Sequence, residues 1–595
     1  MPPSDGVDPH GIAATTVVAV TTVGLVGAGP AVEAVRAALD DGSADARPID
    51  PGAVGRTDVA VDPSTVGRTD VAVVAGGVDD DLRTAATAAR RSETPVVVVE
   101  VGGIGGRAVA GVDAAVSGHA PGTACYDCLR RRVEAVGDET DGGNAGAATA
   151  RFAGAVAGRE LAALAGGGES SLLGGVVEVP HARRRPLPVP FCDCAAAPDR
   201  SLRTDDGERP LAEALASAEA ALDERLGPVA AVGEAESFPV PYYLSTLASA
   251  PFADADPPDH AAGVAREWDP AFMRALGEAL ERYAAAVYRT DDLRGEPASP
   301  VPPERFVAPG DPVETAAVDA WHDAEALVSG EAVQLPAELV VFPPPERRIR
   351  PAITTGLGLG NGGVEALLSG LYEVIERDAA MLSWYSTDEP AGLAVDDEGF
   401  GTLAARAGSE GLSTTALLLT QDVDVPVVAA CVHRDGAWPR FAAGSSASLD
   451  PAAAARGALA EAVQNWLELR RMGPDRAAEE SGAIGRYADL PESAREFVDP
   501  ATTLPAAAVG PDPVPDGRAE LEALLERVET AGLDAYGARL TPRDVDALGF
   551  EAVRVVVPAA QPLFTDEPYF GERAETVPVA LGFEPRPERA HHPFP

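Results

Sequence analysis

The stretch GLGNGGVEALLSGLYEVIERDAAMLSWY, residues 358–385, decides the fold of the larger part of the chain. After a glycine-rich start its apolar residues recur at helical spacing, which predicts one long helix. Its polar positions follow one another at intervals of four, four and three: Glu365, Ser369, Glu373 and Glu376. Asn361 lies one turn earlier. These groups share one helical face and their neighbours are apolar, so the helix is predicted to be largely buried with three carboxylates in one stripe.

Two further segments are predicted helices with matching polar groups. AFMRALGEALERYAAAVYR, residues 271–289, carries on one face Glu278, Glu281 and Arg282. The same E-x-x-E-R order recurs in the long helix as Glu373, Glu376 and Arg377. DPAAAARGALAEAVQNWLELRR, residues 450–471, adds Arg456, Glu461 and Gln464. For a single such helix, a solvated face with weak local ion pairs is the simpler interpretation.

The three helices together favour a different interpretation. Carboxylates aligned in a buried helix repel one another unless cations bind between them. Magnesium prefers oxygen ligands, and arginine guanidinium groups suit phosphate oxygens. The duplicated pattern therefore indicates a site for Mg²⁺ and a polyphosphate that does not depend on a P-loop.

The composition excludes several other kinds of function. Asp and Glu number 93 against 47 basic residues, and the resulting net charge of −46 argues against nucleic acid or anionic lipid as a partner. All 47 basic residues are arginine. Without lysine the chain has no P-loop lysine, no pyridoxal Schiff base and no Ser-Lys dyad. The acidic bias predicts a halophilic protein whose self-repulsion is screened by salt.

The N-terminal part alternates predicted strands and helices, and residues 12–120 are expected to form a parallel sheet. A strand leads into a glycine turn at Gly27 and Gly29. The third glycine position of a dinucleotide-binding turn is occupied by Val32, so we expect docking there rather than adenylation. A tandem copy, VGRTDVAV at 54–61 and again at 66–73, is interpreted as a loop insertion followed by a strand.

Four of the five cysteines fall into two close pairs: Cys125 with Cys128, and Cys192 with Cys194. Two such pairs of thiolates predict a tetrahedral zinc site. With all four positions filled by protein, this zinc is expected to be structural rather than catalytic. The fifth cysteine, Cys431, lies in an apolar run and is predicted to belong to the core.

On these residues the sequence resembles the YcaO-domain family, and within it the azoline-forming cyclodehydratases that act on ribosomally made peptides. The resemblance spans residues 205–595 and rests on the E-x-x-E-R segment at 278–282, the stretch quoted first, LTQDVDVPVVAACV, LDPAAAARGALAEAVQ, and VVPAAQPLFTDEPYFG before a proline-rich end. Residues 12–200 resemble the companion domain of that family, a degenerate ThiF/MoeB-type domain with a four-cysteine zinc. The resemblance implies an α/β chain with a Rossmann-like zinc-binding domain followed by a large α/β YcaO domain.

The resemblance also implies an ATP- and Mg²⁺-dependent reaction. A Cys, Ser or Thr of a peptide becomes an azoline through phosphorylation of the preceding backbone amide oxygen. Magnesium ligation is implied for Glu278, Glu281, Glu365, Glu373 and Glu376. Contacts to the nucleotide are implied for Arg282, Asn361, Ser369, Arg377, Arg456, Glu461 and Gln464. Relatives of this type end in P-x-P-x-P, whose terminal carboxylate reaches the active site; here the end is HHPFP, so Pro595 joins Glu373 and Glu376 as a candidate catalytic residue.

Three positions depart from the pattern of that family. Arg274 stands where the family usually has Ser, Val264 lies where a Gly-Lys turn is usual, and Gly457 replaces a frequent Arg. These departures bear on nucleotide affinity more than on the fold. They leave two alternatives open: a member of the same family that forms thioamides or amidines, and a catalytically idle scaffold that docks a peptide.

The expected partners and location also follow from the resemblance. It implies a precursor peptide as substrate, a homodimer and a cytoplasmic enzyme. Because no winged-helix segment precedes the glycine turn, we expect a separate leader-peptide recognition protein, and a flavin dehydrogenase is a further candidate partner. The uncharged run at 11–32 follows Asp5 and Asp8 and is rich in Thr, Val and Gly, so neither a signal peptide nor a membrane span is predicted.

Overall fold

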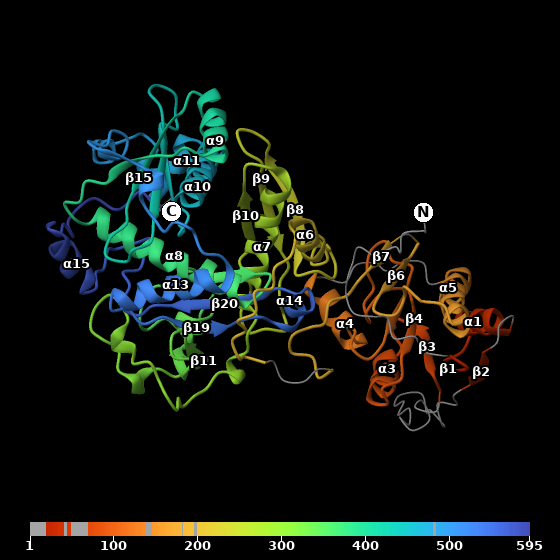
Figure 1. Cartoon of the computed structure of the whole chain (residues 1–595). Coiled ribbons are helices and arrows are strands. Elements are labelled where there is room, and N and C mark those ends of the chain that lie inside the picture. Colours follow the sequence, from red (N-terminus) through yellow and green to blue (C-terminus); the bar gives the residue numbers. More distant parts are fainter. Residues whose placement is uncertain are drawn as a thin grey trace. The chain divides into compact units, whose positions relative to one another are not determined.

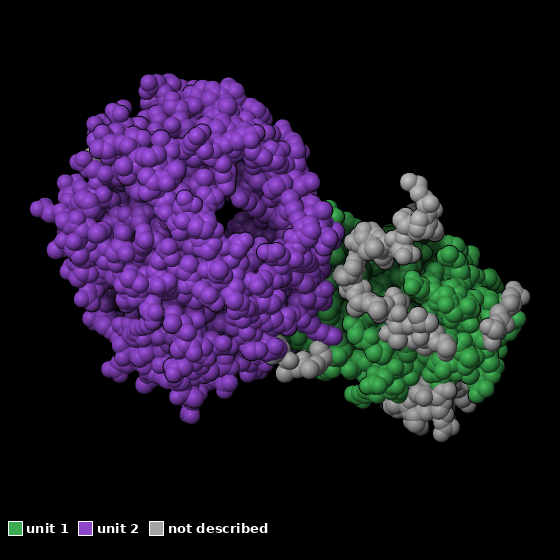
Figure 2. Space-filling view, in the orientation of Figure 1, with its two compact units in different colours: residues 1–198, 219–231, 248–253 green, residues 199–218, 232–247, 254–595 purple. Residues whose placement is uncertain are grey.

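The computed structural model of the chain describes the residues 20–40, 44–48, 69–137, 146–180, 182–194, 199–479 and 483–594. The chain divides into two compact units (Figure 2): unit 1 comprises 1–198, 219–231 and 248–253, and unit 2 comprises 199–218, 232–247 and 254–595. Several predicted features lie outside the described residues: Pro595, the segment 12–19, the first repeat copy at 54–61 and the start of the second at 66–68.

Unit 1 is built on a seven-stranded sheet with the order β2-β1-β3-β4-β5-β6-β7 (Figure 1). Its strands are β1 (Thr22–Val26), β2 (Asp45–Pro48), β3 (Val71–Gly77), β4 (Val96–Val101), β5 (Ala114–His119), β6 (Val176–Val179) and β7 (Ala182–Arg184). The strands from β1 to β4 pair in parallel, but β5, β6 and β7 are antiparallel to their neighbours. The sheet is therefore mixed rather than parallel, because the chain returns from β4 to β5 without the crossover helix that a parallel pair needs.

Helices cover both faces of this sheet: α1 (Pro30–Asp40), α3 (Leu82–Arg91), α4 (Tyr126–Ala135) and α5 (Ala147–Ala165). Alternate residues of a strand point to opposite faces. Val71 and Val73 pack with α1 and α5, whereas Ala72 and Val74 pack with α3 and α4. Burial on both sides explains why the central strands are continuous apolar runs in the sequence.

Three further sheets follow along the chain, with the orders β10-β9-β8, β12-β11-β19-β20-β13 and β17-β16-β15-β14-β18. Their strands are β8 (Val229–Glu236), β9 (Tyr242–Leu247), β10 (His260–Val264), β11 (Trp321–Ala326), β12 (Ala332–Pro336), β13 (Leu357–Gly360), β14 (Ala391–Ala394), β15 (Ser413–Leu418), β16 (Val427–His433), β17 (Phe441–Ala447), β18 (Thr503–Pro505), β19 (Tyr536–Arg539) and β20 (Glu551–Val556). The helices between them are α6 (Leu211–Glu219), α7 (Trp268–Ala286), α8 (Gly363–Trp384), α9 (Glu398–Ser409), α10 (Pro451–Met472), α11 (Pro474–Glu479), α12 (Ala483–Tyr487), α13 (Gly517–Thr530), α14 (Arg543–Ala547) and α15 (Arg573–Leu581).

The helix α8, which carries the decisive stretch, lies between the two five-stranded sheets. Its apolar residues share one core with Val553 and Val555 of β20 and with Ala429 and Cys431 of β16. The neighbouring residues of β16 point the other way and pack with α10. Buried on two sides, α8 exposes few positions, and Cys431 lies in the core as predicted.

The long helices keep their predicted order along the chain but differ at their ends. The helix expected at 271–289 begins three residues earlier, at Trp268, and ends at Ala286. None of the helices in the described part of the chain is both long enough and apolar enough to cross a lipid bilayer.

Gly263 of β10 allows α7 to lie directly on the strand. A Cβ at this position would be 2.1 Å from the backbone nitrogen of Ala275 and 2.5 Å from the carbonyl oxygen of Ala271. Gly263→Ala is therefore expected to lower the free energy of unfolding by about 1–3 kcal/mol, because the strand and helix must separate.

A matched control lies on the same helix. A Cβ at Gly277 would meet only Leu359 Cδ2, at 3.8 Å. Gly277→Ala is expected to be neutral or to stabilise by up to about 1 kcal/mol, because alanine favours helix more than glycine does. Urea-induced unfolding measures both variants, and equal midpoints for the two would contradict the close approach at Gly263.

Candidate functional site

An open cavity of about 520 Å³ in unit 2 is lined by residues of β10, α7, β13, α8, β17 and α10. In the view of Figures 1 and 2, unit 2 is hollowed between α10 and the pair formed by β10 and α7. Most of the sequence-predicted nucleotide and magnesium residues line this cavity: Glu278, Glu281, Asn361, Glu365, Ser369, Glu461 and Gln464. Residues from three separate helices thus reach one space, although up to about 190 positions separate them in sequence.

The start of α8 holds one polar pair at the cavity wall. Glu365 accepts hydrogen bonds from the backbone nitrogen and from Nδ2 of Asn361, both at 2.9 Å. The carbonyl oxygen of that amide, Asn361 Oδ1, is buried and has no hydrogen-bond partner among the described residues. An unsatisfied buried oxygen is costly without a ligand, so its place here fits a cation or a hydrogen-bond donor of a bound molecule.

The first E-x-x-E-R group lies on α7. Arg282 lies 3.1 Å from Glu278 and 3.9 Å from Glu281. Burial raises the pKa of Glu281 to about 8, and repulsion by Glu373 adds to the effect while Arg282 opposes it. The pKa of Glu278 is also raised by burial. One guanidinium therefore does not balance the carboxylates around it.

The second E-x-x-E-R group is tied to β17 and α10. The hydroxyl of Ser445 donates to Glu376 at 2.6 Å, and its backbone nitrogen donates to Glu461 at 2.6 Å. Arg377 lies 3.4 Å from Glu376 and 3.9 Å from Glu461. Burial raises the pKa of Glu461 to about 7, with repulsion from Glu376 acting against the attraction of Arg377.

Glu373, the first carboxylate of the second group, also acts on a carboxylate of the first group. Its Oε2 accepts a hydrogen bond from the backbone nitrogen of Gly356 at 2.9 Å, and its charge raises the pKa values of Glu281 and Glu461. The described residues thus gather five carboxylates around two arginines: Glu278, Glu281, Glu373, Glu376 and Glu461 with Arg282 and Arg377. This oxygen-rich, under-compensated set fits divalent cations such as Mg²⁺.

Arg456 lies elsewhere. It lines a second cavity of about 570 Å³, where it pairs with Asp397 at 2.6 Å and Asp450 at 3.5 Å. The two cavities share Arg274 and Gly457 in their linings. Of the residues predicted to contact the nucleotide, Arg456 is therefore held in the second cavity by two aspartates. The predicted site residues Arg282, Glu373, Glu376 and Arg377 are likewise not among the residues that line the first cavity.

Sequence reasoning missed three residues of this region. Ser445 and Ser446 of β17 line the first cavity, and Arg554 of β20 lies beside the carboxylates. Burial lowers the pKa of Arg554 to about 9, and Glu373 opposes that shift. The serine pair in GSSAS at 444–448, directly before the third helix, could have been recognised from the sequence as part of the site. Nothing in the sequence around Arg554 indicates the site, because only the pairing of β20 with β13 brings Arg554 close to the carboxylates.

The C-terminal segment packs against the far end of α8. Trp384 Nε1 donates to the carbonyl oxygen of Ala590 at 2.7 Å. His592 Nε2 lies 2.7 Å from the carbonyl oxygen of Phe564, and Phe594 is fully buried in the core around α8. The segment before Pro595 is thus fixed, while Pro595 itself lies outside the described residues.

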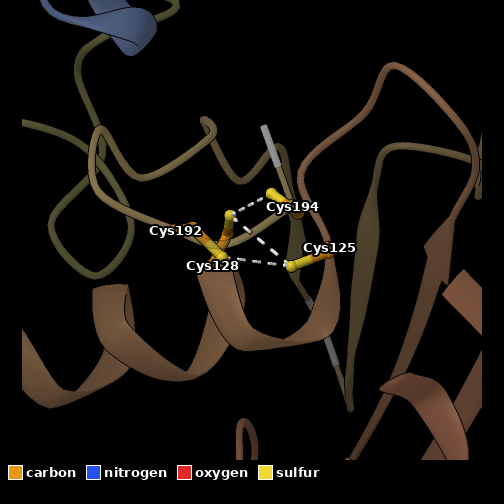
Figure 3. Close-up of side chains that lie close together, drawn as sticks. All are labelled: Cys125, Cys128, Cys192 and Cys194. Atoms are coloured by element: carbon orange, nitrogen blue, oxygen red, sulfur yellow. Dashed lines mark hydrogen bonds between the residues drawn. The ribbon is translucent and has the colours of Figure 1, made fainter. Parts of the chain in front are cut away.

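The four paired cysteines meet in unit 1, as Figure 3 shows. Cys125 and Cys128 lie at the start of α4, and Cys192 and Cys194 lie in the loop after β7. Their sulfur atoms all lie within 4.8 Å of one another, with contacts of 3.5, 3.6 and 3.7 Å. A tetrahedron with metal–sulfur bonds of about 2.3 Å has edges of about 3.8 Å, so the cluster fits a zinc ion.

His119, close to this cluster, does not serve as a further ligand. Its ring nitrogens lie 2.8 Å from the carbonyl oxygen of Ala124 and 2.9 Å from Ser117 Oγ. Burial lowers the pKa of His119 to about 4, so the ring stays neutral. All four ligand positions of a metal here come from the cysteines.

The sequence of this chain is similar to a known protein family and to a protein of another organism. Residues 262–561 match the model of a family described as YcaO cyclodehydratase, ATP- and Mg²⁺-binding. An uncharacterized protein of Methanothermobacter thermautotrophicus is 31% identical over 320 residues, which cover 50% of this chain and 81% of that protein.

Two solved structures share the fold. A heterocyclase in complex with substrate and cofactor has a TM-score of 0.68 at 20% identity, covering 95% of this chain and 84% of that one. The YcaO protein of Methanopyrus kandleri bound with AMPPCP and Mg²⁺ has a TM-score of 0.51 at 25% identity, covering 64% of this chain and 99% of that one. Because the family model spans half of the sequence and the archaeal relative matches over most of its own length, this chain belongs to the YcaO cyclodehydratase family.

Proposed function

We propose that this chain catalyses the ATP- and Mg²⁺-dependent cyclodehydration of Cys, Ser or Thr residues in a ribosomally made precursor peptide. One observation carries the proposal: acids of α7, α8 and α10 line one cavity in unit 2, namely Glu278, Glu281, Glu365 and Glu461. The second E-x-x-E-R group contacts this lining through Ser445 and Glu461. Membership of a family of ATP- and Mg²⁺-binding cyclodehydratases supports the same reaction.

The proposed reaction needs no protein nucleophile. The thiol or hydroxyl of the substrate residue loses its proton to a base or to solvent and attacks the preceding amide carbon, and the resulting oxyanion takes the γ-phosphoryl group of ATP with release of ADP. Loss of phosphate from the former carbonyl carbon and of the amide proton then forms the C=N bond of a thiazoline or oxazoline. Catalysis of phosphoryl transfer rests on positioned charge more than on covalent chemistry.

The residues in and around the cavity would have distinct roles in this reaction. Glu278, Glu281, Glu365, Glu373 and Glu376 would hold Mg²⁺, which supplies positive charge at the phosphates when bound. Arg377 and Ser445 hold Glu376 and Glu461 in place. Asn361 has one oxygen free for the ligand, and Ser369 and Gln464 offer further hydrogen bonds at the wall. The carboxylate of Pro595 is proposed to reach the same site.

We also propose that the four cysteines hold a structural zinc. It would lie in a degenerate ThiF/MoeB-like domain spanning 12–200, with the YcaO domain spanning 205–595. The fit of the sulfur spacing to a tetrahedral site supports this assignment.

The proposed partners are a precursor peptide, a separate leader-recognition protein and a flavin dehydrogenase that oxidises the azoline. The YcaO domain is proposed to form a homodimer. An enzyme that consumes ATP is proposed to act in the cytoplasm.

The test is mass spectrometry of a precursor peptide encoded beside this chain, after incubation with ATP and Mg²⁺ in roughly molar KCl, chosen because salt screens the acidic surface. We expect each modified residue to lose one water, with ATP consumed in step. A gain of about 16 Da would instead identify exchange of oxygen for sulfur. No ATP turnover by a folded, zinc-containing sample would leave the scaffold alternative.

A further inference from the structure

The first cavity is lined by acids and by one cation. Among the described residues at its wall, the acids are Glu278, Glu281, Glu365 and Glu461. Arg274 is the single arginine there, and no histidine joins it in that lining. The chain contains no lysine, so among the described residues Arg274 is the one positive side chain at this wall.

The guanidinium of Arg274 makes no ion pair among the described residues, unlike those of Arg282, Arg377 and Arg456. Its Nη1 donates to the carbonyl oxygen of Val264 at 3.0 Å, and the side chain stays exposed to the cavities. No carboxylate of the described residues lies within ion-pair distance of it. By contrast, Arg282 and Arg377 each pair with two glutamates, and Arg456 pairs with two aspartates.

The hydrogen bond between Arg274 and Val264 joins the two positions at which the sequence departs from the family's pattern on α7 and β10. It fixes one end of the guanidinium against the strand. The remaining N–H donors stay available, and Arg274 lies on the wall shared by both cavities. A planar fork held at one corner is suited to bidentate contact with phosphate oxygens.

We propose that Arg274 binds the phosphate groups of the nucleotide and is the cation on which its affinity depends. This inference rests on the proposed function, because it assumes that the first cavity holds ATP. An acid-lined cavity repels a triphosphate, and bound Mg²⁺ satisfies the carboxylates first; an unpaired guanidinium then adds attraction for the phosphates themselves.

The experiment measures binding by calorimetry on the full chain with Mg²⁺, using ATP and adenosine as probes. Arg274→Ala and Arg274→Gln are expected to weaken ATP binding about ten- to hundredfold, because charge-assisted hydrogen bonds are lost. Arg274→Lys is expected to lie between them and the wild type. Adenosine, which has no phosphate, is expected to bind all four proteins alike.

The matched control is Arg266→Ala. Arg266 lines only the second cavity and pairs with Glu267 at 3.1 Å, so its loss is expected to change ATP affinity less than about twofold. Circular dichroism checks the fold of each variant, and Arg274→Gln, which keeps a donor for Val264, decides the matter if Arg274→Ala unfolds.

The outcomes separate this inference from the proposed function. If the wild type binds MgATP and Arg274→Gln binds it within twofold, the role of Arg274 is wrong while the function stands. If adenosine and ATP lose affinity equally, Arg274 shapes the cavity rather than binding phosphate, and the inference is overturned. If the wild type itself does not bind MgATP, the proposed function fails.

Discussion

Glu376→Gln is expected to lower ATP turnover at least about a hundredfold, the scale of losing one preorganised charge contact at a phosphoryl-transfer site. Glu376 is buried, accepts a hydrogen bond from Ser445 at 2.6 Å and lies 3.4 Å from Arg377. The amide keeps the size of the side chain but removes a carboxylate proposed to bind magnesium and leaves Arg377 with one carboxylate fewer. Phosphate release in roughly molar KCl, with saturating peptide, measures the effect.

The control for this variant is Glu520→Gln. Glu520 lies on α13, which packs on α8, and accepts a hydrogen bond from Tyr372 of α8 at 2.5 Å, outside both cavities. Glu520 is half-buried and hydrogen-bonded to α8, so its substitution tests whether the loss of any such glutamate disturbs the structure of α8. We expect turnover within about threefold of wild type for Glu520→Gln. Wild-type turnover by Glu376→Gln would show that Glu376 does not take part in the reaction.

Cys128→Ser is expected to release zinc and to destabilise unit 1 strongly. Structural zinc contributes about 10–16 kcal/mol of apparent binding free energy in small domains, which is larger than the stability of most folded units. Cys128 is fully buried in the first turn of α4 and its sulfur accepts a hydrogen bond from the backbone nitrogen of Val189 at 3.3 Å. Elemental analysis of the purified chain should find one zinc in the wild type and none in the variant.

Cys431→Ala is the matched control for zinc. Cys431 is equally buried but lies in β16 of unit 2 and is not part of the cluster. This variant should keep its zinc and lose only the packing of one sulfur, about 1–2 kcal/mol. A wild-type chain that folds without zinc, and whose thermal unfolding is unchanged by a strong chelator, would contradict a structural role for the metal.

The three long helices were predictable because their polar stripes and apolar faces repeat at a local period. The convergence of Glu278, Glu376 and Glu461 followed from the matching patterns on those helices. The cysteine cluster was predictable because the two cysteines of each pair are close together in sequence, within one turn or loop. Features that depend on residues close together in sequence can therefore be predicted from the sequence alone.

Other features depend on pairing that no local pattern reports. The position of Arg456 is set by Asp397, which is 59 residues away, and the place of Arg554 is set by the pairing of β20 with β13. The antiparallel turn from β4 to β5 likewise follows from a loop without a crossover helix. Each of these three features depends on contacts between segments that are distant in sequence.

The burial of α8 between two five-stranded sheets also bears on the entropy of binding. A helix packed on both faces has its side chains ordered before any ligand binds. The conformational entropy lost in aligning Glu373 and Glu376 is therefore lost on folding and not on binding. A ligand that meets an already ordered set loses less of its affinity to immobilising the protein. The opposite wall of the cavity is formed by α7 and by β10, an edge strand of a three-stranded sheet to which Arg274 is hydrogen-bonded.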